Sequence, residues 1–382
     1  MHCMVSVTEF DVVIAGSGVA GGGCALQLAR QGARVALFDR EEFPRDKVCG
    51  EFLAPESVAI LRQLEMEGHI LSSGGVKVRD AMLHSPSGHS LIFSLETLHP
   101  KAEHGLAISR SRLDQLLFEN ALKAGAHASD RVRVDSVSAT SDGRQQVDCT
   151  DFRSGEKLSI HCRYFVDAAG RKSKFTSHPQ GRRSYFGYKT HWPEPLVPRG
   201  EVHLFFFEGG YGGATVIEAG RTSVSIMATP ELFRNAQGDF SHLMAATVFQ
   251  NRAAQRMLAG LDPSFARWIT TGPLIFELKD GSISQWIHLG DAAGMIDPFT
   301  GEGMSFALRT AWMLAEEIKR GGGYAEMKGR FDQRVLKELQ SCYRGSARLR
   351  WLAERPWLLN PAFRIASRNR WLRRKLVKMT RG

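Results

Sequence analysis

The spacing of apolar positions changes several times along the chain, and each change indicates a different element. Residues 11–15 (DVVIA) form a short β-branched apolar run, which is typical of a strand buried in a parallel sheet. Residues 20–31 then have helical periodicity that ends at Gly32, and residues 33–40 (ARVALFDR) form a second buried strand. This order predicts a parallel βαβ unit at the start of the chain.

The middle of the chain shows strand-like patterns. Within residues 184–230, alternation is clear in TSVSIM, and the paired glycines on both sides of Tyr211 are expected at turns or bulges (Gly209, Gly210, Gly212 and Gly213). Together with residues 76–94, these runs predict a largely antiparallel sheet. Helical periodicity returns from about Gly303 to Ile318, where apolar residues fall on one face.

A glycine-rich turn joins the first strand to the first helix. Gly16, Gly18 and Gly21 have the GxGxxG spacing, and Asp39 ends the second strand 18 residues after Gly21. The first glycine permits the tight turn, the second lets the backbone approach a pyrophosphate, and the third lets helix and strand pack closely. Asp39 can accept hydrogen bonds from an adenosine ribose, and its carboxylate would repel a 2′-phosphate. The motif therefore favours FAD or NAD over NADP at this position.

Two later segments favour FAD in particular. One is YFVDAAGRKS (164–173), a strand that ends at Asp167 and is followed by Gly170, and the other is the Gly290-Asp291 pair after a strand at 286–289. A nicotinamide-binding unit needs neither segment, whereas an extended FAD needs both. Asp291 can bind ribityl hydroxyls. The N-terminus of the following helix can face the flavin ring and stabilise the negative charge of reduced flavin.

Taken together, these motifs resemble the FAD-dependent oxidoreductases of the p-hydroxybenzoate hydroxylase fold, which are relatives of the group A flavin monooxygenases. The resemblance extends over roughly residues 10–320 and is greatest to the geranylgeranyl-reductase-like branch, through FPRDKVCGEFLAPES (43–57) and SRSRLDQLL (109–117). The resemblance implies that the following residues bind FAD: Gly16, Gly18, Gly21, Asp39, Arg40, Arg45, Arg112, Asp167, Gly170, Gly290, Asp291, Pro298, Gly301, Gly303 and Met304.

The expected fold class is α/β, with a Rossmann-like FAD-binding domain, an antiparallel-sheet substrate domain and a helical C-terminal tail. The FAD-binding domain is expected to be discontinuous, made of residues 1–75, 105–175 and 275–335. The substrate domain would comprise 76–104 and 176–274, and basic amphipathic helices would occupy 336–382.

Few residues suggest chemistry apart from the flavin. Cys49, in KVCGE, could face the substrate or tune the flavin, or could be a small buried residue beside a glycine turn, and Tyr211 is the second catalytic candidate. The tryptophan-isoleucine-proline signature of flavin-dependent halogenases is absent near Tyr211, and Lys77 is only a nominal candidate for their active-site lysine. Neither a Ser/His/Asp triad nor a metal-ligand cluster is discernible, so no metal is expected.

Composition agrees with an ordinary globular protein, because 43% of the 382 residues are hydrophobic and 24% are charged. The net charge of +10 is concentrated in residues 344–382, which contain twelve Lys or Arg and one acidic residue. This tail, which includes Trp351, Trp357 and Trp371, suggests either helices with a solvated basic face or an amphipathic element that contacts an anionic membrane. No nucleic-acid-binding module accompanies the charge. Six scattered cysteines and the lack of a signal peptide lead us to expect a cytoplasmic protein.

The expected function is that of an FAD enzyme acting on a hydrophobic small molecule. The resemblance implies an NADH- or NADPH-dependent monooxygenase that hydroxylates or epoxidises an aromatic, quinone-like or prenylated compound through a flavin C4a-hydroperoxide. One alternative is a reductase that saturates isoprenoid double bonds. The other is a non-catalytic flavin-binding protein associated with membranes.

Overall fold

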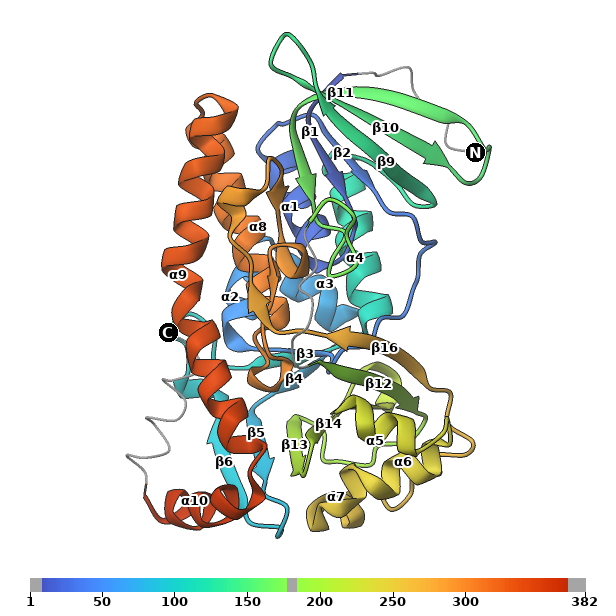
Figure 1. Cartoon of the computed structure of the whole chain (residues 1–382), viewed down its shortest axis with the longest axis vertical. Helices are drawn as coiled ribbons and strands as arrows, with labels where there is room; N and C mark the ends of the chain where they lie inside the picture. Colours follow the sequence, from blue (N-terminus) through green and yellow to red (C-terminus); the bar gives the residue numbers. More distant parts are fainter. Residues whose placement is uncertain (1–8, 177–183, 370–382) are drawn as a thin grey trace.

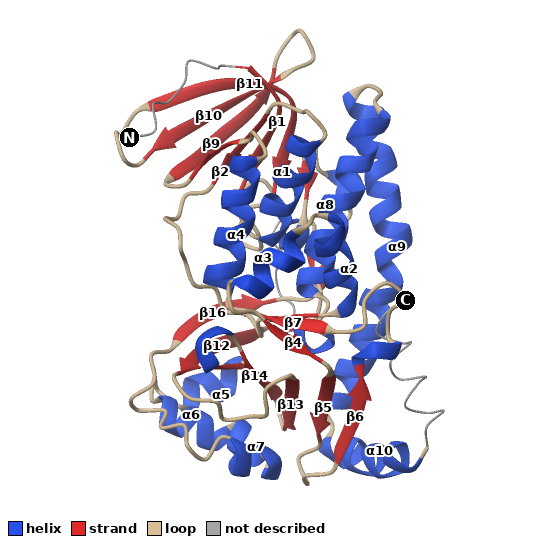
Figure 2. Cartoon of the chain, turned by 180° about the vertical axis from the view of Figure 1, so that it is seen from behind, coloured by secondary structure: helices blue, strands red, loops and turns tan. Residues whose placement is uncertain are grey.

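Figure 1 shows a computed structural model of the chain, which describes residues 9–176 and 184–369. Two sheets lie at opposite ends of the molecule, with helices between and around them (Figures 1 and 2). The expected fold class is confirmed, since a Rossmann-like unit, an antiparallel sheet and C-terminal helices are all present.

The first sheet brings the sequence motifs together at one edge. Its strands run in the order β8-β2-β1-β11-β10-β9, and a short strand, β18, also pairs with β11. Their bounds are β1 (Glu9–Ala15), β2 (Val35–Phe38), β8 (His127–Ser129), β9 (Val132–Ala139), β10 (Gln145–Asp151), β11 (Lys157–Asp167) and β18 (Ile287–His288). Ala15 lies opposite Asp167, and Asp167 lies opposite His288, in parallel pairs. The segments that follow β1, β11 and β18 therefore leave the sheet at the same carboxyl edge, where ligands bind in open α/β sheets.

Helices cover one face of this sheet and form the largest core with it. They are α1 (Val19–Arg30), α2 (Pro55–Gln63), α3 (Met66–Ser72), α4 (Arg110–Lys123) and α8 (Gly303–Arg320). Small residues let α1 pack closely on both sides, because a Cβ at Gly22 would lie 2.9 Å from Leu117 and one at Gly23 would lie 3.1 Å from Leu308. Nearly all of α1 is buried, so its pattern is that of an enclosed helix rather than an amphipathic one.

The second sheet has the order β16-β12-β15-β14-β13-β5-β6. Its strands are β5 (Asp80–His84), β6 (Ser90–Ser94), β12 (Tyr185–Trp192), β13 (Glu201–Phe207), β14 (Gly210–Val216), β15 (Thr222–Ala228) and β16 (Ile269–Leu274). All neighbours are antiparallel except β13 and β5, which are parallel. One face packs against α5 (Pro230–Asn235), α6 (Phe240–Ala246) and α7 (Arg252–Met257) (Figure 1).

The glycines around Tyr211 only partly follow the turn or bulge positions expected from the sequence. Gly209, with a φ of +85°, lies in the turn before β14, whereas Gly210, Gly212 and Gly213 lie inside that strand. A Cβ at Gly212 would lie 2.8 Å from the side chain of Val248, which packs on the backbone there. The domain boundary predicted between residues 75 and 76 coincides with the start of β4 (Val76–Val78), which pairs with β7 (Gly105–Ala107). With β3 (Phe52–Leu53), these strands form a small sheet between the two units.

The C-terminal helices extend from one unit to the other. Helix α9 (Tyr324–Ala353) runs down the side of the molecule, and α10 (Pro356–Arg368) turns across the end near β6 (Figures 1 and 2). Two short strands, β17 (Glu277–Leu278) and β19 (Gly294–Met295), pair beside α9. Trp371 and the basic residues after it lie outside the described residues. Among the described helices, none has both the length and the apolar character needed to cross a membrane.

Candidate functional site

A cavity of about 520 Å³ lies between the motif edge of the first sheet and the inner face of the second. The sequence motifs line one end, including Gly18, Gly170, Asp291 and the start of α8. The other end is apolar, and its lining includes Leu83, Leu91, Phe93, Leu98, Phe206, Leu352, Leu359 and Phe363. One continuous space therefore joins a polar, glycine-rich end to an apolar chamber.

The three glycines of the first motif have different local roles. Gly16 has a φ of +100°, and a Cβ on Gly21 would lie 1.8 Å from the carbonyl oxygen of Gly16, so both glycines are required by the turn itself. Gly18 has an ordinary φ of −77° and lines the cavity, with the nearest protein atom to its Cβ position 3.6 Å away on Arg110. The protein therefore has room for a side chain at Gly18, and the absence of one leaves the helix N-terminus open to a ligand.

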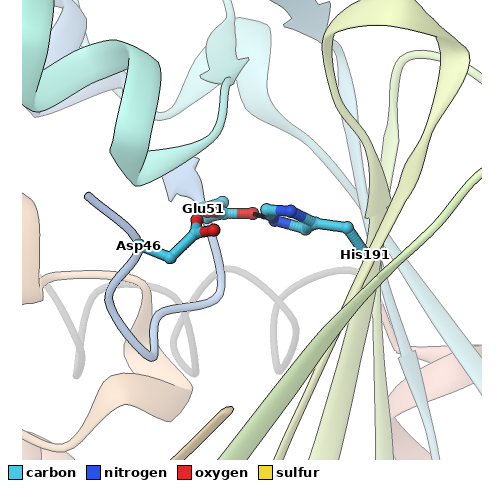
Figure 3. Close-up of side chains that lie close together, drawn as sticks. All are labelled: Asp46, Glu51 and His191. Atoms are coloured by element: carbon cyan, nitrogen blue, oxygen red, sulfur yellow. Dashed lines mark hydrogen bonds and ion pairs between the residues drawn. The ribbon is translucent and has the colours of Figure 1, made fainter. Parts of the chain in front are cut away.

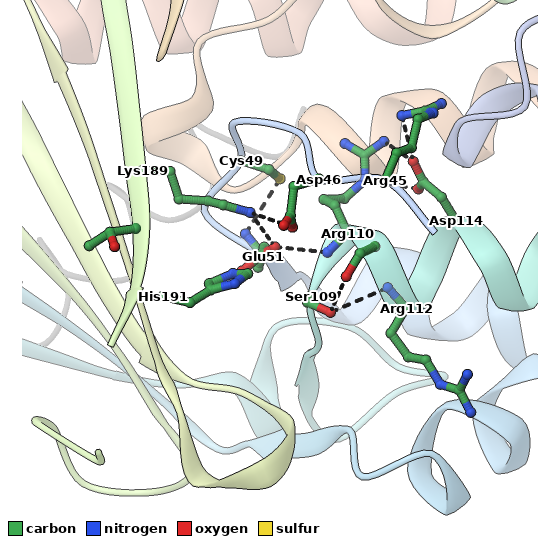
Figure 4. Close-up of polar contacts among 12 residues, drawn as sticks. Arg45, Asp46, Cys49, Glu51, Ser109, Arg110, Arg112, Asp114, Lys189 and His191 are labelled. Atoms are coloured by element: carbon green, nitrogen blue, oxygen red, sulfur yellow. Dashed lines mark hydrogen bonds and ion pairs between the residues drawn. The ribbon is translucent and has the colours of Figure 1, made fainter. Parts of the chain in front are cut away.

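Asp39 lies directly beside this turn. Its Oδ2 accepts hydrogen bonds from the Ser17 amide at 2.8 Å and from Arg45 at 3.0 Å. Arg45 also contacts Asp114 at 3.4 Å, and Asp114 forms a bidentate pair with Arg110, as Figure 4 shows. This ion-pair network fixes the carboxylate at the end of β2, next to the glycine turn.

The second and third motifs meet through Asp167. This buried carboxylate accepts hydrogen bonds from the Ala169 amide, from the Ser173 hydroxyl at 2.7 Å and from His288 at 2.8 Å. Asp167 thus shapes the loop after β11, while Gly170 lines the cavity itself.

Gly290 and Asp291 line the cavity beside that loop. The Gly290 amide donates to the hydroxyl of Thr310 in α8, which ties the motif to the helix. Asp291 stays partly exposed and faces the ammonium of Lys47 at 3.8 Å. Its carboxylate is therefore available to a polar ligand in the cavity.

The start of α8 completes the cofactor end. Pro298, Gly301, Gly303 and Met304 all line the cavity, and Gly301 has a φ of +71° that turns the chain into the helix. The N-terminal amides of an 18-residue helix stabilise a negative charge that lies close to them. This arrangement agrees with the role that the sequence suggested for Gly303 and Met304.

Three buried polar atoms support the fit of a phosphate- and hydroxyl-rich cofactor. Within the described residues, the hydroxyls of Ser17 and Ser305 and the Nε of Arg45 are buried without a hydrogen-bond partner. Such atoms are costly unless a ligand satisfies them. Ser17 and Arg45 lie at the glycine turn, and Ser305 lies in the first turn of α8, so the residues present fit FAD.

The three arginines that the sequence analysis assigned to FAD binding lie in different surroundings. Arg45 is part of the Asp39 network, whereas Arg40 is exposed and pairs with Glu41. Arg112 points to Gln115 and Ser73 and does not line the cavity, while Arg110, two residues earlier, does. The geometry therefore favours Arg110 over Arg112, the residue expected from the sequence, for a cofactor contact.

Cys49 lies in a loop that covers the cavity, and Lys47 to Phe52 all line it. The Cys49 sulfur accepts a hydrogen bond from the Glu51 amide at 3.4 Å. The placement keeps both expectations for Cys49 open, since the residue is half-buried and faces the cavity.

Glu51, which the sequence analysis did not single out, holds this loop against the second sheet. Its buried carboxylate accepts hydrogen bonds from Lys189 at 2.7 Å and His191 at 2.6 Å, both from β12, and from the Arg110 amide at 2.8 Å (Figure 4). Burial by itself would raise the pKa of Glu51, but His191 and Lys189 outweigh it and lower the pKa to about 2. One sequence feature could have revealed this cluster. Lys189 and His191 are two positions apart in a predicted strand, so both basic side chains lie on the same face of the sheet.

Asp46, Glu51 and His191 lie close enough to share a cation, as Figure 3 shows. The Lys189 ammonium, however, lies 2.7 Å from Glu51 and 3.6 Å from Asp46. It already supplies the positive charge that a metal would bring, so the group is best described as an ion-pair cluster.

Tyr211 lines the cavity near its middle and takes part in a second buried network. Its hydroxyl donates to Asp297 at 3.2 Å, and Arg350 of α9 donates to the same carboxylate at 3.1 Å. Burial raises the pKa of both Tyr211 and Asp297. Arg350 belongs to the basic tail, and its spacing in the sequence gave no sign that it turns inward.

A pair of histidines lies at the cavity wall. His84 and His203 contact each other at 3.0 Å with their rings stacked, and His203 lines the cavity. Burial lowers the pKa of each to about 4, so both imidazoles are neutral at pH 7. Neither was a candidate from the sequence, because lone histidines in strands are usually core residues.

Comparison with known proteins agrees with this geometry. Residues 9–192 match the protein family described as "FAD binding domain". The matched part makes up slightly less than half of the chain. It contains the glycine turn, Asp39, the Cys49 loop and the Asp167 motif.

Relatives and solved structures extend the likeness to most of the chain. The menaquinone reductase of Mycolicibacterium smegmatis is 26% identical over 329 residues, which are 82% of this chain and 78% of that protein. A myxobacterial FAD-dependent halogenase, CndH, has a TM-score of 0.75 at 20% identity and covers 88% of this chain and 81% of its own. PqsL of Pseudomonas aeruginosa, solved in complex with 2-aminobenzoylacetate, has a TM-score of 0.76 at 18% identity. The match covers 92% of this chain and 98% of PqsL.

These findings show an FAD-dependent oxidoreductase with the fold of the group A flavin monooxygenases and halogenases. The prediction of an FAD enzyme is confirmed, and the non-catalytic alternative is disfavoured. The chain spans 61% and 78% of the lengths of the first two curated relatives that it matches. Lys77, the nominal halogenase lysine, is exposed on β4 and does not line the cavity.

Proposed function

We propose that this enzyme is an NADH- or NADPH-dependent monooxygenase that hydroxylates or epoxidises a hydrophobic aromatic, quinone-like or prenylated small molecule. One observation carries the proposal: a single cavity joins the cofactor end to an apolar chamber of Leu and Phe side chains. An apolar enclosure suits a substrate of this kind and excludes water from a reactive oxygen species.

Bound FAD would supply the redox chemistry, accepting hydride from NAD(P)H and activating dioxygen. The overall balance is substrate plus O₂, NAD(P)H and a proton, giving the oxygenated substrate, NAD(P)⁺ and water. The residues of the chain itself would bind and orient the cofactor and the substrate. Asp39, Asp291 and the N-termini of α1 and α8 hold the cofactor, and the Glu51 cluster fixes the loop that covers it.

Tyr211 is the best placed polar group for the substrate. Because its hydroxyl donates to Asp297, its oxygen keeps lone pairs that can accept a hydrogen bond from a phenolic or hydroquinone hydroxyl in the cavity. Tyr211 thereby orients a substrate whose apolar part occupies the Leu and Phe chamber.

A reductase that saturates isoprenoid double bonds is the second candidate function. It is favoured by the likeness to menaquinone reductase and by the Cys49 loop at the cavity wall. In that case two hydrogens would be added to the substrate, and O₂ would not be consumed in forming product.

Product mass separates the two functions. FAD-loaded protein is incubated with NADH or NADPH, ¹⁸O₂ and a panel of hydrophobic quinones, phenols and prenylated compounds, and products are analysed by mass spectrometry. One ¹⁸O atom in the product supports the monooxygenase, while a gain of two hydrogens without ¹⁸O supports the reductase. Oxygen taken only from water would contradict both.

Tyr211→Phe tests the orienting role in the same assay. We expect FAD content to stay unchanged and turnover to fall about tenfold, because one substrate hydrogen bond is lost. Phe265→Ser is the matched control, since Phe265 is highly exposed and does not line the cavity. Equal turnover in wild type and Tyr211→Phe would remove Tyr211 from the site.

A further inference from the structure

Helix α10 has two apolar faces, and the residues that the structure describes cover only one of them. Leu359, Phe363 and Ala366 point inward and are buried with Leu91 of β6 and Phe206 of β13. On the opposite side, Trp357, Pro361 and Ile365 follow a four-residue spacing and are exposed. Trp357 is 72% exposed and Ile365 59% exposed, which is unusual for the outer side of a helix facing water.

The inner face of the same helix forms part of the cavity wall. Leu359, Ala362 and Phe363 line its apolar end, together with Leu352 and Ala353 at the end of α9. A single helix therefore separates the apolar chamber from the exposed face that carries Trp357 and Ile365. Figures 1 and 2 place α10 at the end of the molecule away from the first sheet.

The surroundings of this exposed face are basic. Arg344, Arg348 and Trp351 on the last turns of α9, and Arg355 directly after the helix, follow one helical spacing. Arg344, Arg348 and Trp351 are exposed, and the Arg355 guanidinium lies 4.1 Å above the Trp351 ring. Arg364 of α10 is exposed as well. The only acidic residue after Arg344 in the chain is Glu354, and it accepts a hydrogen bond from Tyr185.

We propose that the outer face of α10 and the last turns of α9 dock on the surface of an anionic lipid bilayer. Tryptophan and isoleucine side chains would enter the interfacial region while arginines contact anionic headgroups, as in interfacial amphipathic helices. This orientation places the apolar end of the cavity at the lipid boundary, where lipophilic molecules are concentrated. The docking does not depend on which reaction the enzyme catalyses.

Co-sedimentation with vesicles tests the apolar part of this surface. Full-length, FAD-loaded protein is mixed with phosphatidylcholine vesicles that contain or lack 30% phosphatidylglycerol. We expect Trp357→Ser/Ile365→Ser to lower the partition coefficient on anionic vesicles by at least about tenfold, because two large apolar side chains are lost. The matched control is Phe265→Ser/Ile283→Ser, which removes two side chains that are each 85% exposed elsewhere on the surface, and should bind as wild type does.

A second variant tests the charged part. Arg344→Gln/Arg348→Gln should weaken binding to anionic vesicles by roughly tenfold or more and leave binding to pure phosphatidylcholine unchanged. Flavin absorbance and circular dichroism check that every variant remains folded and loaded. Since no turnover is measured, a negative result here leaves the proposed function untouched.

Three outcomes would overturn the proposal. Wild-type protein could stay in the supernatant with anionic vesicles, or the apolar variant could bind as tightly as wild type. Sedimentation velocity could instead show that wild type self-associates and that Trp357→Ser/Ile365→Ser dissociates it, which would assign the face to a second copy of this chain.

Discussion

At the scale of individual residues, sequence patterns could identify some site residues and not others. Glycines and strand-end aspartates were identifiable because backbone conformation and ligand approach restrict those positions to few residue types. Glu51 was not identifiable, since its role depends on Lys189 and His191, which lie more than 130 residues away. Likewise, Asp297 acquires its partners from β14 and α9 only once the chain is folded.

Glu51→Gln should destabilise the protein because buried Lys189 loses the carboxylate at 2.7 Å and keeps only the more distant, half-exposed carboxylate of Asp46 at 3.6 Å. The side chains of Lys189 and Glu51 are 1% and 0% exposed, so the cost should be about 3 kcal/mol in urea-induced unfolding. The double variant Glu51→Gln/Lys189→Met should recover part of the lost unfolding free energy, because it no longer buries a poorly compensated ammonium. Glu41→Gln is the control, because it removes an exposed pair with Arg40 and should cost less than about 1 kcal/mol.

The same carboxylate should contribute to acid unfolding. Its pKa is lowered from 4.5 to about 2 in the folded state, so its stabilisation is complete above pH 4.5 and is lost as the pH falls towards 2. Across this window it accounts for about 3 kcal/mol of the loss in unfolding free energy of the wild type. Glu51→Gln should therefore show a shallower decline between pH 4.5 and 2. Parallel curves for the two proteins would contradict the assignment.

At the scale of helices and strands, periodicity predicted the elements whose pattern is set by local burial. Strand β1, helix α1, strand β2 and helix α8 all lie within a few residues of their expected bounds. Prediction failed where another element determines the outcome. Gly210, Gly212 and Gly213 were expected at turns or bulges, yet they form part of β14, where Val248 packs directly on the backbone of Gly212. The sequence resemblance pointed to Arg112, whereas the rotation of α4 brings Arg110 to the cavity instead.

The turn between β1 and α1 allows a matched pair of glycine substitutions. Gly18→Ala should fold with nearly unchanged stability, because φ is −77° and the nearest protein atom to the new Cβ is 3.6 Å away. Its methyl group would occupy cofactor space, so the Kd for FAD should rise at least about tenfold. Gly21→Ala instead forces a contact of 1.8 Å with the Gly16 carbonyl and should reduce the yield of folded protein even without FAD. Fluorescence titration of the apoproteins with FAD and thermal denaturation measure the two effects. Equal FAD affinity in wild type and Gly18→Ala would contradict the placement of the cofactor at this turn.

At the scale of the whole molecule, the cavity could not be predicted from the sequence. Its walls come from the motif edge of the first sheet, the inner face of the second, and helices α9 and α10, so its shape depends on how distant segments pack. The sequence indicated an antiparallel-sheet substrate domain, and the structure adds that the C-terminal helices close the apolar end of the cavity. The tail predicted from charge alone thus divides into an inward part, represented by Arg350 and Phe363, and an outward part, represented by Trp357.

This division predicts different effects for the two faces of α10. Phe363→Ala removes a buried side chain that lines the cavity, so α10 should open more often and its amides should exchange with deuterium faster. Trp357→Ala, on the exposed face, should leave exchange in α10 unchanged in the absence of lipid. FAD content should be the same in both, because neither residue belongs to the glycine turn or to α8. If α10 seals the chamber, Phe363→Ala should also release more hydrogen peroxide per NAD(P)H oxidised, since water then reaches the oxygen-activating end of the cavity. Faster exchange without extra peroxide would mean that the chamber is sealed by the second sheet alone, and that α10 serves to support β6.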